Sequence, residues 1–427
     1  MPSGGELGGA RRLWPAGAPS EFSAPALGGA GPATAAIEQA ALSLGLRPRW
    51  RLWAGSVSLA ECDLLDEAGA PASGARGLGK GRDQAEARLY ALGEALERFL
   101  TGPTSLDSAA VRFIAAEELA DGVLAQEASA PLLRQLTGSA IACCAYQALH
   151  TGQDDATIPL YLGAPWYAGQ DGHVYRDRVG DRADYQGLSR YSVQSGYGLA
   201  PTQDEATVHA LLETVERDAC SLLTLRTFIS GRQPTVIDPH TLPEDLALLH
   251  TQAQRELDAT VHLINATTDL GIPTVLAYCT PGDGTPYRRG QAAALATRDA
   301  VTGAITEPLE FQLPRAAPPP IALTPLKPYP ALHRCARFDL TDALQQTHTT
   351  AFLDRPSPEA PRAQLDELLA RLAAAGFTAY RRHVAVLPGE VSAVHTVVPG
   401  LERFFAVVKG ALILPSPRGR TCCDARR

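Results

Sequence analysis

Hydrophobic and polar residues follow two different periods along the chain. Between residues 36 and 312, stretches with an apolar residue at every third or fourth position alternate with short β-branched runs such as ATVHLINAT (259–267) and IPTVLAYC (272–279). The same alternation resumes in LDELLARLAAAGFTAYRRHVAVL (365–387). The first period is typical of amphipathic helices and the short runs are typical of strands. The sequence therefore predicts an α/β fold of mixed helix and sheet layers.

Two segments interrupt this pattern. Residues 1–35 consist largely of Gly, Ala, Pro and Ser, so little apolar surface is available to offset the entropy of ordering, and we expect a flexible leader. Residues 313–330 contain seven prolines, which exclude helix and most sheet. We therefore expect a core over 36–312, a connector over 313–330, and a C-terminal lobe and tail over 331–427 that complete the domain.

Composition narrows the class of protein. A chain of 427 residues with 45% hydrophobic and 20% charged residues is typical of a soluble globular protein. Its net charge of -8 argues against nucleic acid and anionic membranes as partners. It has neither an apolar stretch near the ~18 to 20 residues of a membrane span nor a secretion signal, so the cytoplasm is expected. Its eight cysteines lack CxxC and zinc-site spacings and are expected to be reduced.

A sixteen-residue segment occurs twice. DQAEARLYALGEALER (83–98) aligns with TQDEATVHALLETVER (202–217) at a constant offset of 119, and eight positions are identical. The identical pairs include Glu86 and Glu205, Glu94 and Glu213, Glu97 and Glu216, and Arg98 and Arg217. Gly77 and Gly79 match Gly196 and Gly198 at the same offset. The repeat predicts a loop-plus-helix unit that is used twice.

A weaker third copy occurs at an offset of 213 from the first. In RDAVTGAITEPLE (298–310), the residues that match Glu86, Ala87, Ala91, Glu94 and Glu97 are Asp299, Ala300, Ala304, Glu307 and Glu310, and Gly290 matches Gly77. Few positions match and Pro308 lies within the segment, so the sequence alone leaves this copy open.

The glycine-rich stretch before the first helix resembles a phosphate-binding P-loop. In GARGLGKG (74–81), the spacing matches as far as Lys80, but Gly81 occupies the position where that loop needs a Ser or Thr hydroxyl for the metal ion. We therefore do not expect this stretch to hold a metal.

The repeated glutamates are spaced i, i+8 and i+11. At about 100° per residue they fall at about 0°, 80° and 20° around a helix, so they share one face. An apolar stripe adjoins this face, and carboxylates beside a packed surface need neutralising cations. Oxygen ligands of this kind suit Mg²⁺ that bridges to phosphates. Ordinary amphipathic helices with i,i+4 ion pairs would explain either copy alone, whereas the duplication favours metal binding.

These residues resemble the YcaO-domain proteins. The resemblance covers about residues 36–405 and depends on GKG followed by ALGEALER (79–98), SGYGLAPTQDEATVHALLETVERDA (195–219), the segment from Gly290 to Glu310, and VVPGLERF (397–404). ERDACSLLTLR, TTDLGIPTVLAY and PGLERFFAVVKG are most similar to the azoline-forming, microcin-type branch. The resemblance implies a YcaO-like fold with the repeated units around an acidic nucleotide site.

The family resemblance implies ATP- and Mg²⁺-dependent activation of a peptide backbone amide. In the azoline-forming branch, a Cys, Ser or Thr side chain adds to the preceding carbonyl, ATP phosphorylates the resulting oxygen, and phosphate leaves to give a thiazoline or oxazoline. Phosphoryl transfer depends mainly on positioning and charge neutralisation, which metal ions held by carboxylates provide. We therefore expect a cyclodehydratase that acts on a ribosomally made precursor peptide, with ATP and Mg²⁺ as cofactors.

The family motifs also imply roles for individual residues. The residues that would ligate Mg²⁺ and contact the phosphates are Glu94, Glu97, Glu205, Glu213 and Glu216. Arg217 would contact the nucleotide and stabilise developing negative charge, and Glu216 is the second predicted catalytic residue. Lys80 and Ser195 are candidate nucleotide contacts, although a solvated lysine and a turn-forming hydroxyl are equally plausible at those positions. Symmetry of the repeat adds Glu86.

Two features depart from the family pattern. Members commonly carry a Gln and then an Arg after the third-motif glutamate, whereas this chain continues Glu307-Pro-Leu-Glu310-Phe-Gln312. Its last residues, LPSPRGRTCCDARR, also lack the Pro-rich terminus of many azoline formers. A thioamide- or amidine-forming enzyme and a non-catalytic scaffold subunit therefore stay open as alternatives. A hydrolase is disfavoured because the chain has no GxSxG motif and Cys220 is expected to be a buried helix residue.

The resemblance further implies partners. The expected substrate is a precursor peptide, and we expect an E1-like partner protein to present it because few residues precede the first motif. A flavin-dependent dehydrogenase in the same pathway would fit this chemistry. Family members often form dimers, so a homodimer is compatible with the resemblance.

Overall fold

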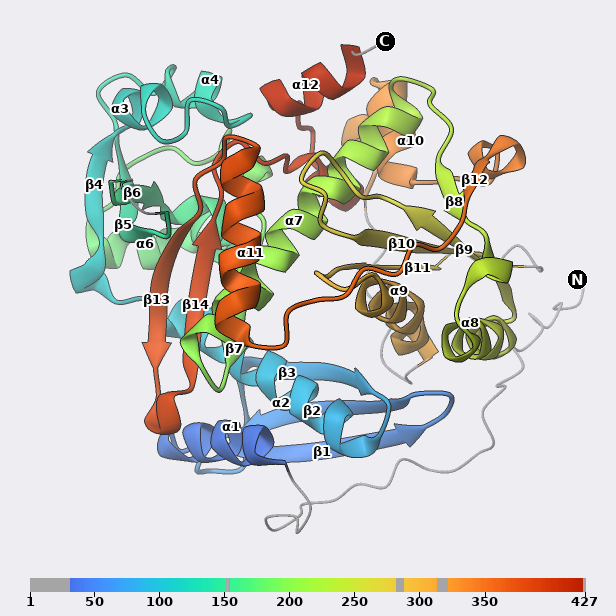
Figure 1. Cartoon of the computed structure of the whole chain (residues 1–427). Coiled ribbons are helices and arrows are strands. Elements are labelled where there is room, and N and C mark those ends of the chain that lie inside the picture. Colours follow the sequence, from blue (N-terminus) through green and yellow to red (C-terminus); the bar gives the residue numbers. More distant parts are fainter. Residues whose placement is uncertain (1–30, 151, 153, 282–287, 313–321, 425–427) are drawn as a thin grey trace, which may run out of the picture.

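The computed structural model describes residues 31–150, 152, 154–281, 288–312 and 322–424, and three β-sheets organise them (Figure 1). The strand orders are β1-β2-β3, β11-β10-β9-β8-β12 and β4-β5-β13-β14-β7, with β6 paired to β5. Helices pack against each sheet. The prediction of a mixed α/β fold is thus confirmed.

The first sheet is antiparallel and carries two helices. Its strands are β1 (Arg47–Ala54), β2 (Ser58–Leu65) and β3 (Pro71–Gly81), and its helices are α1 (Pro32–Ser43) and α2 (Gln84–Thr101). Apolar residues of both helices and all three strands form one buried cluster. Because α1 begins at Pro32, a residue type suited to the first helical turn, residues 32–35 of the predicted leader are helical. Residues 1–30 of that leader lie outside the described residues.

The second sheet contains the two β-branched runs identified in the sequence. Its strands are β8 (Thr235–Ile237), β9 (Ala259–Asn265), β10 (Thr274–Pro281), β11 (Arg288–Ala293) and β12 (His348–Thr350). Helices α8 (Glu244–Leu257) and α9 (Thr297–Thr306) pack on one face. Residues of α7 (Gln203–Phe228) and α10 (Pro330–Arg337) pack on the other.

The third sheet combines strands from distant parts of the chain. It consists of β4 (Arg112–Ala115), β5 (Ala140–Ala148), β6 (Ala156–Pro159), β7 (Tyr197–Ala200), β13 (Tyr380–Val386) and β14 (Ser392–Val397). β13 and β14 lie between β5 and β7, and α11 (Pro361–Ala374) packs against α7 beside them (Figure 1). Residues after the Pro-rich stretch therefore share a sheet with the core. Residues 313–321 of that stretch are not described, and α10 begins at its last residue.

Short helices complete the chain. They are α3 (Ala116–Asp121), α4 (Ala130–Leu133), α5 (Pro165–Ala168), α6 (His173–Val179) and α12 (Pro417–Asp424). None of the described helices is long and apolar enough to cross a membrane. All eight cysteines are free, and Cys220 is buried within α7, as expected.

The repeated unit is a strand followed by a helix, and the prediction of a loop before each helix was wrong. The first two units are β3–α2 and β7–α7, and close packing of strand on helix explains the glycines. A Cβ atom on Gly79 would lie 2.0 Å from the Ala87 carbonyl oxygen, and one on Gly198 would lie 2.3 Å from that of Ala206. Ala87 and Ala206 are equivalent at the offset of 119. Only glycine allows the two backbones to approach so closely.

The third copy, which the sequence left open, is present as β11–α9. A Cβ atom on Gly77 would lie 2.1 Å from the Ala91 carbonyl oxygen, and one on Gly290 would lie 2.3 Å from that of Ala304. Gly290 and Ala304 are the equivalents of Gly77 and Ala91 at the offset of 213. After α9 the chain continues as a 3₁₀ helix, Glu307–Gln312, because Pro308 cannot extend an α-helical hydrogen-bond ladder.

Candidate functional site

The three units bring their glutamates to one place. Glu97 of α2 is close enough to Glu213 of α7 and to Glu94 for repulsion between the carboxylates to shift its pKa. Glu216 of α7 experiences the same repulsion from Glu307, and Glu94 experiences it from Glu310. Glutamates separated by more than two hundred residues in sequence therefore form one cluster. We call the six residues Glu94, Glu97, Glu213, Glu216, Glu307 and Glu310 the glutamate cluster.

In each unit, one glutamate accepts a hydrogen bond from a backbone N–H in or next to the glycine-containing strand of the same unit. The three hydrogen bonds run from Leu78 N to Glu94 Oε2 (2.5 Å), from Gly196 N to Glu213 Oε2 (2.8 Å), and from Gln291 N to Glu307 Oε2 (2.6 Å). Glu94, Glu213 and Glu307 are equivalent positions of the repeat. The strand thus fixes the first glutamate of each helix, and the second, three residues later, lies about one turn further along.

Burial makes ionisation of the cluster costly. Desolvation, together with the neighbouring carboxylates Glu213 and Glu94, raises the pKa of Glu97 to about 8. Desolvation also raises the pKa of Glu216 to about 8, with repulsion from Glu307 and Glu213 opposing the attraction of Arg217. These two side chains therefore ionise less readily in the ligand-free protein than exposed glutamates do.

Among the described residues, three cationic side chains form ion pairs with the cluster. Arg217 pairs with Glu213 (3.2 Å) and Glu216 (3.0 Å), Arg98 pairs with Glu94 (2.5 Å), and Lys80 pairs with Glu310 (3.4 Å). Burial would lower the pKa of Arg217, but the adjacent glutamates Glu216 and Glu213 raise it above its usual value. Lys409 also interacts electrostatically with Glu213. Among these described side chains, six carboxyl groups face four cations, which leaves an excess of negative charge when all six ionise.

The donor set fits Mg²⁺ that arrives with phosphates better than it fits a preformed metal cage. Within the described ranges, no three His, Cys, Asp or Glu side chains form a ready metal site. Several carboxylate oxygens are instead occupied by backbone N–H groups and arginines. Mg²⁺ typically takes one or two protein carboxylates together with waters and substrate phosphates. The oxygen donors and the excess negative charge of the cluster meet that requirement.

A small cavity opens beside Arg217. It has a volume of about 20 Å³, and its lining includes Ser195, Thr214, Arg217, Arg403 and Phe405. The Arg217 guanidinium carbon lies 5.2 Å from the centre of the Phe405 ring, within cation–π distance. Ser195 and Arg217, two predicted nucleotide contacts, therefore line the same cavity, and Lys80 lies at the cluster through Glu310.

Two predicted glutamates have local roles in this structure. The Glu205 carboxylate accepts hydrogen bonds from the backbone N (3.2 Å) and Oγ1 (2.9 Å) of Thr202, which completes a capping box at the start of α7. Glu86 pairs with Arg82 at 3.1 Å near the start of α2. Both lie eight residues, or about 12 Å along the helix, before Glu213 and Glu94 respectively. No hydrogen bond or ion pair among the described residues joins either one to the glutamate cluster.

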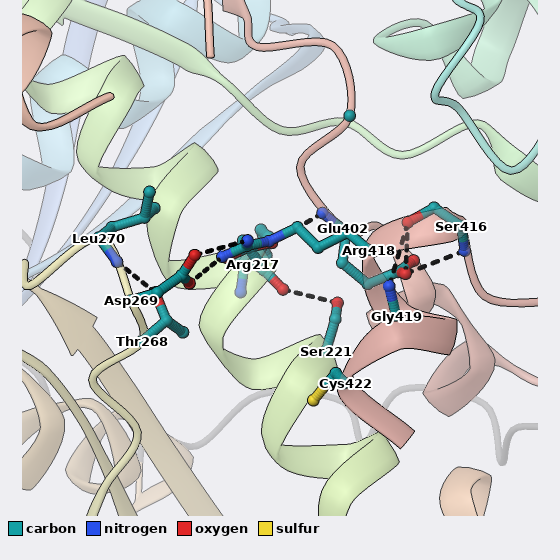
Figure 2. A network of polar contacts seen from close by, with 12 residues as sticks. Arg217, Ser221, Thr268, Asp269, Leu270, Glu402, Ser416, Arg418, Gly419 and Cys422 are labelled. Carbon is teal, nitrogen blue, oxygen red and sulfur yellow. Dashed lines mark hydrogen bonds and ion pairs between the residues drawn. The ribbon is translucent and has the colours of Figure 1, made fainter. Parts of the chain in front are cut away.

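The C-terminal segment supplies residues that sequence reasoning missed. Nε and Nη2 of Arg418, in α12, donate to the two carboxylate oxygens of Asp218 (2.8 and 2.9 Å), and Arg418 also binds Asp269 (Figure 2). Asp218 is fully buried and follows Arg217 in α7. In the sequence, the one indication of this contact was Asp218 itself, an acidic residue followed by a largely apolar stretch of α7.

Glu402 ties the same segment to α7. Its Oε2 accepts hydrogen bonds from the backbone N (2.9 Å) and hydroxyl (2.7 Å) of Ser416 (Figure 2). Its own N–H donates to Asp218 Oδ1 (2.8 Å). The chain that follows Glu402 contains Arg403 and Phe405, which line the Arg217 cavity. Phe405 N donates to Ser221 Oγ (2.8 Å), which fixes this chain on α7. The C-terminal segment therefore supports one wall of the cavity.

Comparison with protein families gives a match over most of the chain. A family model described as YcaO cyclodehydratase, binding ATP and Mg²⁺, matches residues 78–402. A curated relative, an uncharacterized protein in the tfuA 3′ region of Rhizobium leguminosarum bv. trifolii, is 36% identical over 92 residues, or 21% of this chain. That match spans about a fifth of the relative, 22% of its length.

Solved structures share the fold. A YcaO protein from Methanopyrus kandleri bound with AMPPCP and Mg²⁺ has a TM-score of 0.59 at 18% identity, covering 86% of this chain and 89% of that one. The E. coli microcin synthetase McbBCD complex has a TM-score of 0.55 at 12% identity, covering 83% of this chain and 88% of that one. A heterocyclase in complex with substrate and cofactor gives 0.55 at 19% identity, covering 81% of this chain and 47% of that one, so this chain spans about half its length.

Proposed function

The chain belongs to the YcaO family of ATP- and Mg²⁺-binding cyclodehydratases, and on that premise we propose that it forms thiazoline or oxazoline rings from Cys, Ser or Thr of a ribosomally made precursor peptide. The observation that carries the proposal is the convergence of three repeated strand–helix units on the glutamate cluster beside Arg217. A structural ion-pair network would not require a cluster of six glutamates whose burial and mutual repulsion oppose their ionisation.

In this proposal the residues that hold Mg²⁺ with the nucleotide phosphates are Glu94, Glu97, Glu205, Glu213 and Glu216. Bound Mg²⁺ would neutralise phosphate charge during phosphoryl transfer. Glu205 is included because of its position in the second family motif. To bind Mg²⁺, its carboxylate would have to give up its hydrogen bonds with Thr202. Lys80 and Ser195 would contact the nucleotide from the β3 strand and from the segment before β7.

Arg217 would stabilise the negative charge that develops during transfer. Its guanidinium is held by Glu213, by Glu216 and against the Phe405 ring, so it needs little reorganisation when charge develops. Glu216 acts on the reaction by orienting this guanidinium through their 3.0 Å contact. A preorganised cation of this kind stabilises a transition state more than a mobile one does.

The substrate would be a precursor peptide presented by an E1-like partner protein, in the cytoplasm, with a flavin-dependent dehydrogenase as a further pathway enzyme. One structural neighbour, the E. coli microcin synthetase McbBCD complex, has been solved with pro-MccB17 bound. That neighbour supports a multi-protein assembly around a peptide. A homodimer of this chain is compatible with the proposal.

The test is a reconstitution of the purified chain with the candidate partner, the precursor peptide and Mg·ATP, read by mass spectrometry. Azoline formation removes one water per ring, and fragmentation places the change at a Cys, Ser or Thr. Exchange of oxygen for sulfur would identify a thioamide-forming enzyme instead, and a water loss that joins an amine to a backbone amide would identify amidine formation. Absence of Mg·ATP binding with partner and peptide present would leave only a scaffold function.

A further inference from the structure

A second and larger cavity lies at the C-terminal end of α2. Its volume is about 380 Å³, within the range of about 300 to 1,000 Å³ that is usual for small-ligand sites. Its lining includes Leu100 and Thr101 of α2, Tyr197 of β7, Trp166 of α5 and Arg382 of β13. None of the residues predicted to bind metal or nucleotide lines it.

This cavity adjoins the proposed active site. Leu100 follows Glu97 by three residues, less than one helical turn, and Tyr197 follows Ser195 by two. The Tyr197 ring stacks on His395 at 4.0 Å, and His395 Nε2 lies 3.1 Å from the Ser195 carbonyl oxygen. The wall of the second cavity is therefore continuous with the residues that line the Arg217 cavity.

Arg382 brings a positive charge to the cavity without an acidic partner. Within the part of the chain that the structure describes, no carboxylate forms an ion pair with its guanidinium, which lies 5.8 Å from the Tyr146 ring. Its Nε is enclosed and has no hydrogen-bond acceptor there. Its guanidinium hydrogen-bonds to the Tyr146 side chain and also interacts with Cys144 and Tyr197. These partners are neutral, because burial raises the pKa of each of them.

The acidic side chain that lines the cavity does not neutralise Arg382. Asp107 Oδ1 accepts a hydrogen bond from Ala109 N (2.9 Å) and caps a 3₁₀ turn, where it is held by the local backbone. Arg112, which also lines the cavity, adds a second positive charge. A partly buried cation without a counter-ion is costly in free energy, so the cavity favours an anionic ligand.

We propose that this cavity binds a carboxylate of the peptide substrate, with Arg382 as its cationic partner. The inference depends on the proposed function, because it supplies a subsite for the same peptide. The planar guanidinium matches a carboxylate with two parallel hydrogen bonds. Apolar side chains, including Leu100, Leu106 and Trp166, form part of the lining and can contact a peptide residue in a way that a free phosphate ion cannot use. The carboxylate belongs either to an Asp or Glu side chain or to the peptide C-terminus.

Calorimetric titration of the full chain with small probes tests this subsite without ATP or partner. The probes are acetyl-Phe-Asp-amide, its Asn counterpart, acetyl-Phe with a free carboxylate, and inorganic phosphate. We expect the Asp peptide or the free acid to bind on the order of tenfold or more tightly than the Asn peptide, as for a hydrogen-bonded charge pair. Tighter binding of the Asp peptide identifies a side-chain carboxylate, and tighter binding of the free acid identifies the C-terminus.

Variants of two arginines locate the effect. Arg382→Gln should abolish the preference for carboxylate, whereas Arg178→Gln, which removes an equal charge from exposed α6, should retain it. Thermal unfolding of each variant, compared with the wild type, confirms that the fold is kept, and Arg382→Lys should retain part of the preference. If neither the Asp peptide nor the free acid binds more tightly than the Asn peptide, or if phosphate binds most tightly, the proposal is overturned.

Failure of this subsite and failure of the proposed function give different results. If the reconstituted chain forms azolines while the carboxylate and amide probes bind equally, only the subsite is wrong. If the chain binds the carboxylate probes through Arg382 but forms no azoline with partner, peptide and Mg·ATP, the subsite holds and the proposed reaction is wrong.

Discussion

Arg418 in the C-terminal helix donates two hydrogen bonds, of 2.8 and 2.9 Å, to the carboxylate of Asp218. Asp218 is the residue that follows Arg217 in the sequence. Asp218 is fully buried, and its Oδ1 also accepts the N–H of Glu402. This relationship connects the last described helix to the wall of the Arg217 cavity, because Glu402 precedes Arg403 and Phe405 there. The far end of the chain therefore supports the proposed nucleotide site.

Replacing Arg418 with Ala should lower the free energy of unfolding by about 3 to 5 kcal/mol, because it leaves Asp218 buried without its cation. Chemical denaturation measures this change. Arg420→Ala, in the same helix, removes only a hydrogen bond to the Pro415 carbonyl and should cost about 1 kcal/mol or less. Asp218→Asn should recover part of the loss in the Arg418→Ala background. A loss below 1 kcal/mol for Arg418→Ala would show that Asp218 is compensated in another way.

Glu213→Gln should reduce the rate of azoline formation by about 100-fold or more, because it removes charge from the cluster and weakens the hold on Arg217. Rates are compared in the reconstituted system at saturating ATP and Mg²⁺. Glu244→Gln, at an exposed position of α8, is the charge-matched control and should retain the wild-type rate. Similar rates for both variants would remove Glu213 from the proposed site.

Glu205→Gln separates two roles of one side chain. Gln also supports a capping box, so the variant should unfold within about 1 kcal/mol of the wild type. If Glu205 ligates Mg²⁺ as proposed, its loss should weaken Mg·ATP binding on the order of tenfold. Denaturation and calorimetric titration read the two effects. Unchanged Mg·ATP affinity would assign Glu205 to helix capping alone.

Mg·ATP binding should strengthen as pH rises towards about 8. Glu97 and Glu216 have pKa values raised to about 8 in the ligand-free protein and must lose their protons to act as metal ligands. Below that pH, binding should release protons, which calorimetry in buffers of different ionisation enthalpy detects. Glu97→Gln should reduce the number released. Binding with no proton release at pH 7 would contradict these roles.

The same two groups set a pH dependence of stability. Because their folded-state pKa values exceed those of the unfolded chain, they stabilise the ligand-free fold most below about pH 4.5, and this contribution is lost as pH rises to about 8. Without Mg·ATP, the Glu97→Gln and Glu216→Gln variants should therefore lose less stability than the wild type between pH 6 and pH 9. Thermal unfolding across that range checks this expectation.

Gly79→Ala should destabilise the protein by about 1 to 3 kcal/mol, because its Cβ atom would lie 2.0 Å from the Ala87 carbonyl oxygen and would force α2 away from β3. Gly93→Ala is the matched control in α2, where a Cβ atom meets nothing within 4 Å, and it should stabilise the helix by up to about 1 kcal/mol. Thermal denaturation distinguishes the two. If both substitutions change the stability equally, close packing of β3 on α2 is not the reason for glycine at position 79.

Local features of the site could be predicted from the sequence. The spacing of Glu94 and Glu97, and of Glu213 and Glu216, fixes the relative directions of these side chains because helical geometry is set by the backbone. The repeat at an offset of 119 indicated that both helices serve one purpose. The pattern Thr202-x-x-Glu205 also matches a capping box, although from the sequence we expect Glu205 only to bind Mg²⁺ and the phosphates.

The sequence by itself thus determined the family, the mixed α/β class and the faces that carry the glutamates. Only the tertiary structure decided that Glu307 and Glu310 join the cluster, that the glycine stretches are strands, and that Arg418 holds Asp218. These features depend on pairing between segments far apart in sequence, such as the placement of β13 and β14 between β5 and β7. Periodicity describes which face of an element is apolar, but the choice of its neighbour is made by the packing of the whole chain.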